Sequence, residues 1–254
     1  MIILAAGQGK RLRPLTDTRP KCLVELGGRS LLDRQIEAAH AAGVDEVIVV
    51  GGYLAEQLPR PNLRLVLNPD YETTNMVATL FCAESLFGNG FIMSYGDIAY
   101  GPALLRTLLA DPSPVGVVVD RDWRDYWEMR FDDPLSDAES LRIDDSGQIQ
   151  SIGQPVSDFD SVEAQYTGLV AFRDSGVSAL RETYAKAQSD DDAGRFPFNG
   201  CRPLAMLHMT DLLQIMIDLG HAVCAVPIRR GWVEIDSLSD LKLARRLVAE
   251  GALA

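Results

Sequence analysis

The sequence predicts an α/β protein built on a doubly wound, mostly parallel sheet, and three observations lead to that fold class. Apolar residues make up 47% of the 254 residues, which is enough for one large core. The first half contains short, nearly unbroken apolar runs, as strands that are buried on both faces require. Helical patterns separate these runs, and alternation of strand and helix is typical of such sheets.

The first half supplies five expected strands and two expected crossover helices. Ser30 suits the N-cap of the first helix, with Asp33 three residues later, and Gly43 follows the end of the pattern at residue 42. The second helix is expected over residues 75–86. The strands are expected at residues 2–5, 47–50, 63–67, 91–93 and 115–119.

The pattern changes from about Trp123. Residues 140–143 and 148–152 are typical of a hairpin, and residues 165–172 of a strand at a sheet edge. Helices are expected at 177–187 and 210–219, with a solvated acidic loop at 189–194, and a capping box at Ser237 and Asp240 begins a last helix after extended segments at 222–227 and 231–236. There is no internal repeat, so we expect one domain over residues 1–254.

Charge and cysteine usage restrict the environment and the partners. The chain has 36 acidic and 24 basic residues and a net charge of −12, which disfavours nucleic acid and anionic membranes as partners. Its four cysteines form no CxxC or Cys/His pattern and are expected to be reduced thiols. The first apolar run is too short for a signal peptide, and no run approaches membrane length. We therefore expect a cytoplasmic protein.

The loop after the first strand carries five cations within twelve residues. Such a cluster in an acidic chain indicates an anionic ligand. The loop does not match a Walker A motif, because Arg11 and Leu12 follow Gly9-Lys10, and Leu12 replaces the third glycine of a dinucleotide fingerprint. Glycines at a strand end still allow backbone N–H groups to approach a polyphosphate. The residues concerned are Gly7, Gly9, Lys10, Arg11, Arg13, Arg19 and Lys21.

Two aspartates lie where a metal ion would be useful. Asp97 follows a predicted buried strand, which directs it to the carboxyl edge of the sheet, where open α/β sheets bind ligands. Asp236, ahead of the last helix, would add a second oxygen ligand of the kind that Mg²⁺ prefers. Each also suits a purely structural turn or capping position.

The stretch LAAGQGKRLRP from Leu4, continued by RPKCL from Arg19, resembles the signature of nucleotidyltransferases that join a nucleoside triphosphate to a phosphorylated small molecule. This resemblance implies a Rossmann-like nucleotidyltransferase fold in which Arg11 holds the outer phosphates and Lys21 the reacting phosphates. It also implies Mg²⁺ at Asp97 and Asp236. Lys10 departs from the serine or threonine of many members. Nucleotide-binding residues implied for the loop are Leu4, Ala5, Ala6, Gly7, Gly9, Lys10 and Arg11.

Residues 68–76, with 79–81 behind them, resemble the branch of CTP:phosphocholine and phosphonate cytidylyltransferases. Members that use dTTP or UTP usually carry a glutamine- and glycine-containing segment here. The resemblance therefore implies CTP, with Thr74 and Asn75 near the base or the ribose. Asn75 also suits the N-cap of the helix that it begins.

A second block, at residues 120–139 and 165–169, resembles stretches of the same cytidylyltransferases. This resemblance implies an acceptor-binding subdomain within residues 123–172. Aromatic side chains next to carboxylates would suit an ammonium group, although each aromatic residue taken alone also suits core packing. Phosphocholine, phosphoethanolamine, 2-aminoethylphosphonate and 2-hydroxyethylphosphonate are the acceptors considered. The expected aromatic wall includes Tyr126 and Trp232, and the expected acceptor-binding residues are Lys21, Asp120, Trp123, Trp127, Asp137, Glu139, Tyr166 and Glu234.

The predicted reaction is Mg²⁺-dependent transfer of CMP from CTP to a small phosphate or phosphonate. An anionic acceptor oxygen can attack without a general base, which suits a chain with three histidines and none in a motif. Alternatives are a sugar-1-phosphate nucleotidyltransferase using UTP, dTTP or GTP, a glycosyltransferase with a DxD motif at residues 120–122, and a non-catalytic nucleotide-binding module. The sequence leaves open whether the chain forms a homo-oligomer.

Overall fold

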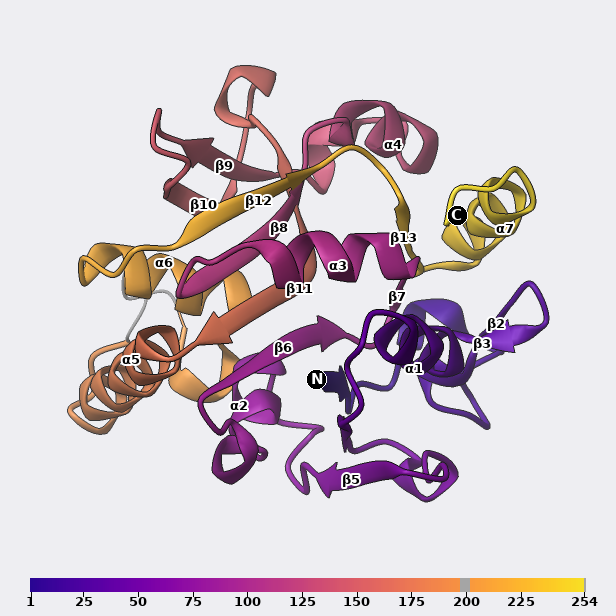
Figure 1. Ribbon diagram of the computed structural model, residues 1–254, viewed down its shortest axis with the longest axis horizontal. Helices are drawn as coiled ribbons and strands as arrows, with labels where there is room; N and C mark the ends of the chain where they lie inside the picture. Colours follow the sequence, from indigo (N-terminus) through magenta and orange to yellow (C-terminus); the bar gives the residue numbers. More distant parts are fainter. Residues whose placement is uncertain (197–201, 254) are drawn as a thin grey trace.

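The computed structural model describes residues 1–196 and 202–253, and its centre is a seven-stranded mixed sheet (Figure 1). Only β11 runs antiparallel to its neighbours β6 and β8, so the predicted mostly parallel sheet is confirmed. In spatial order the strands are β12 (Cys224–Ile228), β8 (Val115–Asp120), β11 (Gln165–Arg173), β6 (Gly90–Tyr95), β1 (Ile2–Ala5), β4 (Val47–Gly51) and β5 (Leu63–Leu67).

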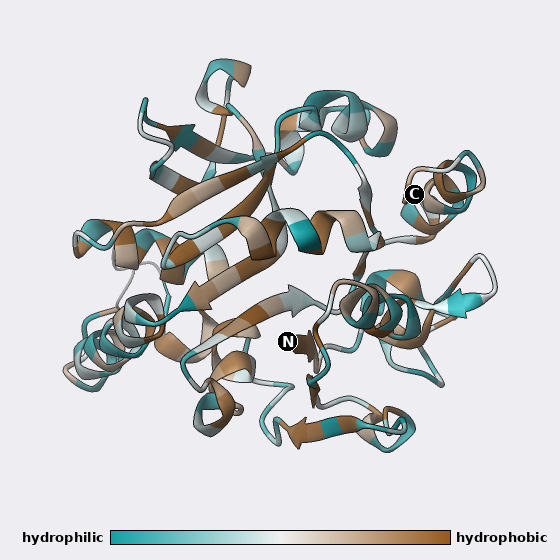
Figure 2. Ribbon diagram, in the orientation of Figure 1, coloured by the Kyte–Doolittle hydropathy of each residue, from teal (hydrophilic) through white to brown (hydrophobic). Residues whose placement is uncertain are grey.

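Two cores cover the faces of this sheet, because successive side chains of a strand point to opposite sides. In β1, Ile3 and Ala5 enter one core while Ile2 and Leu4 enter the other. Each face is covered by helices, which confirms the doubly wound arrangement, and Figure 2 shows the apolar strands at the centre. Helices α1 (Leu31–Ala41), α3 (Pro102–Ala110), α4 (Trp123–Arg130) and α7 (Leu238–Ala249) pack into the first core, and α2 (Met76–Phe81), α5 (Ser175–Asp192) and α6 (Met209–Asp218) into the second.

Short elements surround the main sheet. The expected hairpin is present as β9 (Glu139–Ile143) and β10 (Ile149–Pro155). The pair β7 (Ile98–Tyr100) and β13 (Trp232–Glu234) and the pair β2 (Glu25–Leu26) and β3 (Arg29–Ser30) are also antiparallel. Short 3₁₀ helices lie at Lys10–Leu12, Lys21–Leu23, Ala55–Gln57, Glu84–Leu86, Pro134–Ser136, Phe159–Ser161 and Leu204–Met206.

The predicted helix caps are confirmed. The hydroxyl of Ser30 accepts a hydrogen bond from the backbone N–H of Asp33 at 3.0 Å, which satisfies one of the free donors at the start of α1. The hydroxyl of Ser237 accepts the N–H of Asp240 while the Asp240 carboxylate accepts the N–H of Ser237, a complete capping box for α7.

Two expectations about the elements were wrong, and one helix had not been predicted. Strand β11 is central rather than at an edge, and its buried run at residues 169–172 is the signal of a strand covered on both faces. The acidic run extends α5 as far as Asp192, because Asp190 pairs with Lys186 and Arg195. The polar, tryptophan-containing stretch after residue 122 is helix α4, whose Trp123, Tyr126 and Trp127 are spaced as the buried face of a helix.

Three cysteines, Cys22, Cys82 and Cys224, are free thiols, and Cys201 lies outside the described residues. Across residues 1–196 and 202–253, every helix is too short or too polar to cross a membrane.

Candidate active site

The site lies at the carboxyl ends of β1 and β6. Gly96 follows β6, and its backbone N–H donates to the carbonyl of Leu4 at 2.9 Å. A Cβ on residue 96 would lie 2.6 Å from that carbonyl oxygen, so glycine is required for this close approach of the two strands. Asp97 is the next residue, and the tight approach holds its carboxylate beside the loop that follows β1.

Asp236 reaches the same place from the other end of the chain. Strand β13 pairs with β7, with Glu234 opposite Ile98, and the N–H of Ile235 donates to the carbonyl of Asp97 at 3.0 Å. Asp97, Glu234 and Asp236 each offer a carboxylate oxygen within 4.8 Å of the others. The antiparallel pair thus brings Asp97 together with Glu234 and Asp236, which lie more than a hundred residues later in the sequence.

Lys21 lies between two of these carboxylates. Its Nζ is 2.7 Å from Oδ2 of Asp97 and 2.6 Å from Oδ1 of Asp236. Burial alone would lower the pKa of Lys21, but the charges of Asp97 and Asp236 outweigh it and hold the pKa above its usual value. Burial would likewise raise the pKa of Asp236, yet Lys21 lowers it. Lys21 and Asp236 are therefore both charged near neutral pH.

The glycine-rich loop packs against the stem of Lys21. Gly9 has φ +60°, and a Cβ there would lie 2.9 Å from Cβ of Lys21, so a glycine makes room for the lysine. Arg11, on the same loop, extends to Asp236, with Nη2 and Oδ1 3.0 Å apart. Its side chain is 66% exposed, so the guanidinium is free to meet a ligand from solvent.

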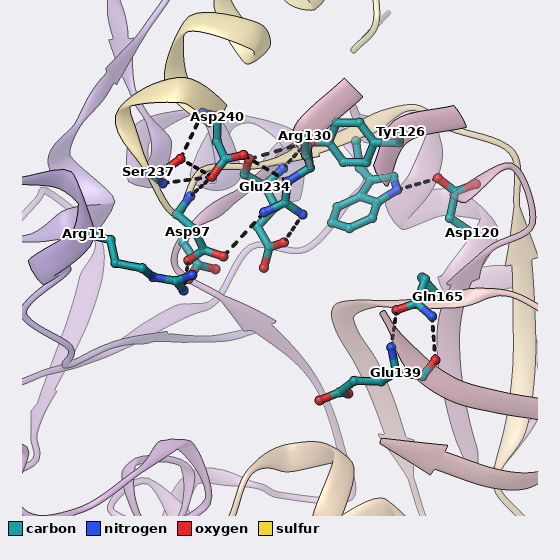
Figure 3. A network of polar contacts seen from close by, with 12 residues as sticks. Arg11, Asp97, Asp120, Tyr126, Arg130, Glu139, Gln165, Glu234, Ser237 and Asp240 are labelled. Carbon is teal, nitrogen blue, oxygen red and sulfur yellow. Dashed lines mark hydrogen bonds and ion pairs between the residues drawn. The ribbon is translucent and has the colours of Figure 1, made fainter. Parts of the chain in front are cut away.

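The guanidinium of Arg130 contacts two of the three carboxylates, those of Glu234 and Asp236 (Figure 3). Its side chain is fully buried, and it donates to Oε2 of Glu234 at 2.6 Å and to Oδ1 of Asp240 at 3.0 Å, with Oδ2 of Asp236 at 3.5 Å. Burial would lower the pKa of Arg130, but Glu234 and its other partners keep the pKa raised. The guanidinium therefore ties the loop around residue 236 to helices α4 and α7.

Three adjoining pockets meet at Asp97, which lines all of them. We name each pocket after the ligand that the sequence predicts there. The first, the nucleoside pocket, is lined by the end of β1 and by residues 74–76, and includes Leu4, Ala5, Ala6, Gly7, Thr74, Asn75 and Thr79. The second, the phosphate pocket, includes Gly7, Gly9, Lys10, Arg11, Lys21 and Asp236. The third, the acceptor pocket, includes Arg11, Trp127, Asp137, Glu139, Tyr166, Glu234 and Asp236.

The expected nucleotide residues all lie in the first two pockets. Asn75 is also the N-cap of α2, the other role that the sequence allowed, because its Oδ1 accepts the backbone N–H of Met76 at 2.9 Å. Capping and pocket lining are compatible here, since the rest of the side chain lines the nucleoside pocket.

The acceptor pocket is acidic. Burial, together with the charges of Asp211 and Asp137, raises the pKa of Glu139 to about 7. Burial also raises the pKa of Asp137, and burial with the Asp236 charge raises that of Glu234. A positive charge entering this pocket would relieve the repulsion among these carboxylates.

Three of the expected acceptor residues do not line this pocket: Lys21 lines the other two pockets, and Asp120 and Trp123 are internal. Asp120 is fully buried, accepts the indole N–H of Trp232 at 2.9 Å and lies apart from Asp97 in Figure 3. Trp123 is 4% exposed and packs against Phe159 and Trp127. Their assignment to acceptor binding was wrong, because both are internal packing residues of the α4 region.

The expected aromatic wall is also corrected. Tyr126 and Trp232 are core residues, and the guanidinium of Arg130 lies 5.4 Å from the ring centroid of Tyr126 and 5.2 Å from that of Trp127. The cation that these rings contact is therefore one of the chain's own. Trp127 borders the pocket, and its buried indole N–H has no hydrogen-bond partner among the described residues.

Several residues of the site were not foreseen. Arg130 contacts the carboxylates, but it stands in a polar stretch whose sequence gives no sign that its partners lie 104 to 110 residues away. Asn68 lies within the segment 68–76 but was given no role there. Residues that line the pockets and had no assigned role include Tyr71, Met76, Tyr95, His208 and Thr210, of which only the aromatic residues and the histidine carry any sequence signal.

Comparison with known proteins decides the family. Residues 1–156 match the model of the MobA-like NTP transferase domain. The chain belongs to this family. It is a nucleotidyltransferase, as its sequence predicts.

Several of its relatives are named for cytidylyl transfer to small acceptors. The chain is 36% identical over 253 residues to the CTP:phosphoglutamine cytidylyltransferase of Campylobacter jejuni, covering 95% of this chain and 97% of that one. It is 37% identical over 94 residues to the 2-aminoethylphosphonate cytidylyltransferase of Lancefieldella rimae, covering 35% and 38%. The structure of CTP:phosphocholine cytidylyltransferase from Streptococcus pneumoniae has the same fold, with a TM-score of 0.71, 22% identity and 97% of each chain covered. These relatives support cytidylyltransferase activity on phosphorylated or phosphonate substrates.

Proposed function

We propose that this nucleotidyltransferase transfers CMP from CTP to a small phosphate or phosphonate that also carries an amino group, and releases pyrophosphate. The observation that carries the proposal is the position of Lys21, between Asp97 and Asp236, where the three pockets adjoin. A nucleoside, its phosphates and an acceptor in these pockets would bring their reacting ends together at that point.

The residues fit Mg²⁺. Asp97, Glu234 and Asp236 provide a hard oxygen donor set, and Oδ1 of Asp97 is buried without a hydrogen-bond partner among the described residues. Asp97 and Asp236 would hold the ion, which when bound would neutralise charge on the triphosphate. The ammonium of Lys21 between the same carboxylates is consistent with a position that favours positive charge.

The chain's own groups supply the rest of the chemistry. Lys21 and Arg11 lie where they would contact the phosphates, and each would reduce the repulsion between two polyanions that must approach in line. An acceptor oxygen forms a bond to the α-phosphorus while the bond from that phosphorus to the bridging oxygen breaks, and pyrophosphate carries the electron pair away. The attacking oxygen is already anionic, so the step needs no general base.

We infer an amino group on the acceptor from the acidic lining of the acceptor pocket. Asp137 and Glu139 line it together with Glu234, which suits an ammonium that donates hydrogen bonds. A quaternary ammonium would rely more on aromatic faces, and Arg130 already lies against those of Tyr126 and Trp127. One relative that spans nearly the whole chain is named for phosphoglutamine, which also carries an amino group.

Pyrophosphate release tests the proposal. CTP, UTP, dTTP and GTP should each be combined with phosphoglutamine, phosphoethanolamine, 2-aminoethylphosphonate, phosphocholine, 2-hydroxyethylphosphonate and several sugar 1-phosphates, with and without Mg²⁺. We expect CTP with an amino-bearing acceptor to give the highest kcat/KM. Turnover confined to UTP or dTTP with sugar 1-phosphates would instead support the sugar-nucleotide alternative.

A further inference from the structure

Thr74 and Thr79, two threonines of the nucleoside pocket, make hydrogen bonds that restrict which base the pocket accepts. We propose that they present only acceptor oxygens to the ligand, held in this state by Asn68, and thereby select the amino-bearing base cytosine over uracil. The inference rests on the proposed function, in which this pocket binds the nucleoside of CTP.

The orientation of the Asn68 amide is fixed by its surroundings. Its Oδ1 accepts the backbone N–H of Asp70 at 3.0 Å, so its Nδ2 must face the other way. There Nδ2 donates to Oγ1 of Thr74 at 3.0 Å and to Oγ1 of Thr79 at 2.9 Å. Asn68 is 3% exposed, so these bonds are protected from competition by water.

The threonine protons are committed elsewhere. Thr74 donates its hydroxyl proton to the carbonyl of Asp70 at 2.8 Å, and Thr79 donates to the carbonyl of Asn75 at 3.1 Å. A hydroxyl has one proton and two lone pairs, and Asn68 takes one lone pair of each. What remains on each oxygen is a single acceptor position, and both residues line the pocket.

This polarity distinguishes the two common pyrimidines. Cytosine carries an amino group at C4, a donor that such an oxygen can accept, whereas uracil and thymine carry a carbonyl at the same position. To bind a carbonyl, a threonine would have to turn its proton away from its backbone partner. A buried site that loses a hydrogen bond for the wrong ligand discriminates against it.

The test compares CTP and UTP in valine variants. Thr79→Val and Thr74→Val keep the shape of the side chain and remove the oxygen. With one fixed acceptor, we expect each to lower the ratio of kcat/KM for CTP to that for UTP by about tenfold, or about 1.4 kcal/mol. The change should lie mainly in the KM for CTP, with the KM for the acceptor changed by less than about twofold. Thr79→Ser, which restores the hydroxyl, should recover the ratio.

Thr107→Val is the matched control. Thr107 is an exposed helical residue on α3 whose hydroxyl also donates to the carbonyl four residues back, Ala103 at 3.2 Å. The ratio of kcat/KM for CTP to that for UTP in Thr107→Val should equal the ratio in the unsubstituted protein. Circular dichroism checks that each variant folds. If one valine variant does not fold, the other still tests the inference. Unchanged ratios in the folded valine variants would overturn the inference alone, whereas an unsubstituted protein that does not turn over CTP would refute the proposed function.

Discussion

Replacing Arg130 with methionine gives the sharpest test of how the acidic cluster is held. The guanidinium is fully buried and bonds Glu234 and Asp240 at 2.6 and 3.0 Å, with Asp236 at 3.5 Å. Methionine fills a similar volume but leaves these carboxylates buried without their cation. Removing one partner of a buried ion pair typically costs about 3–5 kcal/mol. For a domain of this size, that is a fall in Tm of roughly 6–20 °C.

The same substitution should reduce activity beyond what stability explains. Asp236 would lose a contact that positions it, and small displacements near reacting groups can lower rates by about a hundredfold. We therefore expect at least about a tenfold loss of kcat at subsaturating Mg²⁺, recovered in part by excess Mg²⁺. Arg130→Lys keeps the charge but not the three-sided contact, and should give an intermediate result.

Urea unfolding and pyrophosphate release measure the two effects separately. Arg124→Met is the control, because Arg124 lies on the same helix with a side chain that is 57% exposed and pairs only with Glu128 among the acidic residues described. It should cost less than about 1 kcal/mol and leave kcat unchanged. An Arg130→Met protein that unfolds earlier but has normal kcat at every Mg²⁺ concentration would refute the positioning argument.

Four further predictions concern three single residues. Asp97→Asn should lower kcat by about a hundredfold or more with an unchanged circular dichroism spectrum, and near-normal turnover would contradict the metal assignment. Glu139, whose pKa is about 7, should bind an ammonium acceptor better as pH rises, so the KM for the acceptor should fall through pH 7 and Glu139→Gln should abolish that dependence. Because folding raises this pKa, the contribution of the carboxyl group to stability is greatest below pH 4.5 and is lost as the pH rises to about 7. At pH 8, Glu139→Gln should therefore be more stable than the parent. The difference in the free energy of unfolding, measured in urea, should be up to about 3 kcal/mol. Trp127→Ala should destabilise by about 3–5 kcal/mol, since the indole is 3% exposed, and a change confined to acceptor KM would contradict its place in the core.

The sequence predicted what depends on neighbours along the chain. The strands, the caps at Ser30 and Ser237, and the loop from Gly7 to Lys21 are local patterns, and the structure has each of them. What it did not predict depends on distant partners. Arg130 acquires its role from residues brought near it by the pairing of β7 with β13, and Trp123 is internal because Phe159 and Trp127 cover it. Aromatic residues in a polar stretch suggested a ligand, but their helical spacing was the stronger signal.

The distribution of charge in the site suits the charges of the two proposed substrates. Lys10, Arg11 and Lys21 line the phosphate pocket, where the proposed triphosphate would be strongly anionic. The acceptor pocket instead holds five carboxylates, an arrangement that would repel a phosphate unless cations intervene. Lys21 and Arg11 stand between the two regions, so the acceptor would have to point its phosphate toward them and its positive end toward Asp137 and Glu139. An acceptor without that positive end would leave the carboxylates uncompensated, and the site would bind it more weakly for that reason alone.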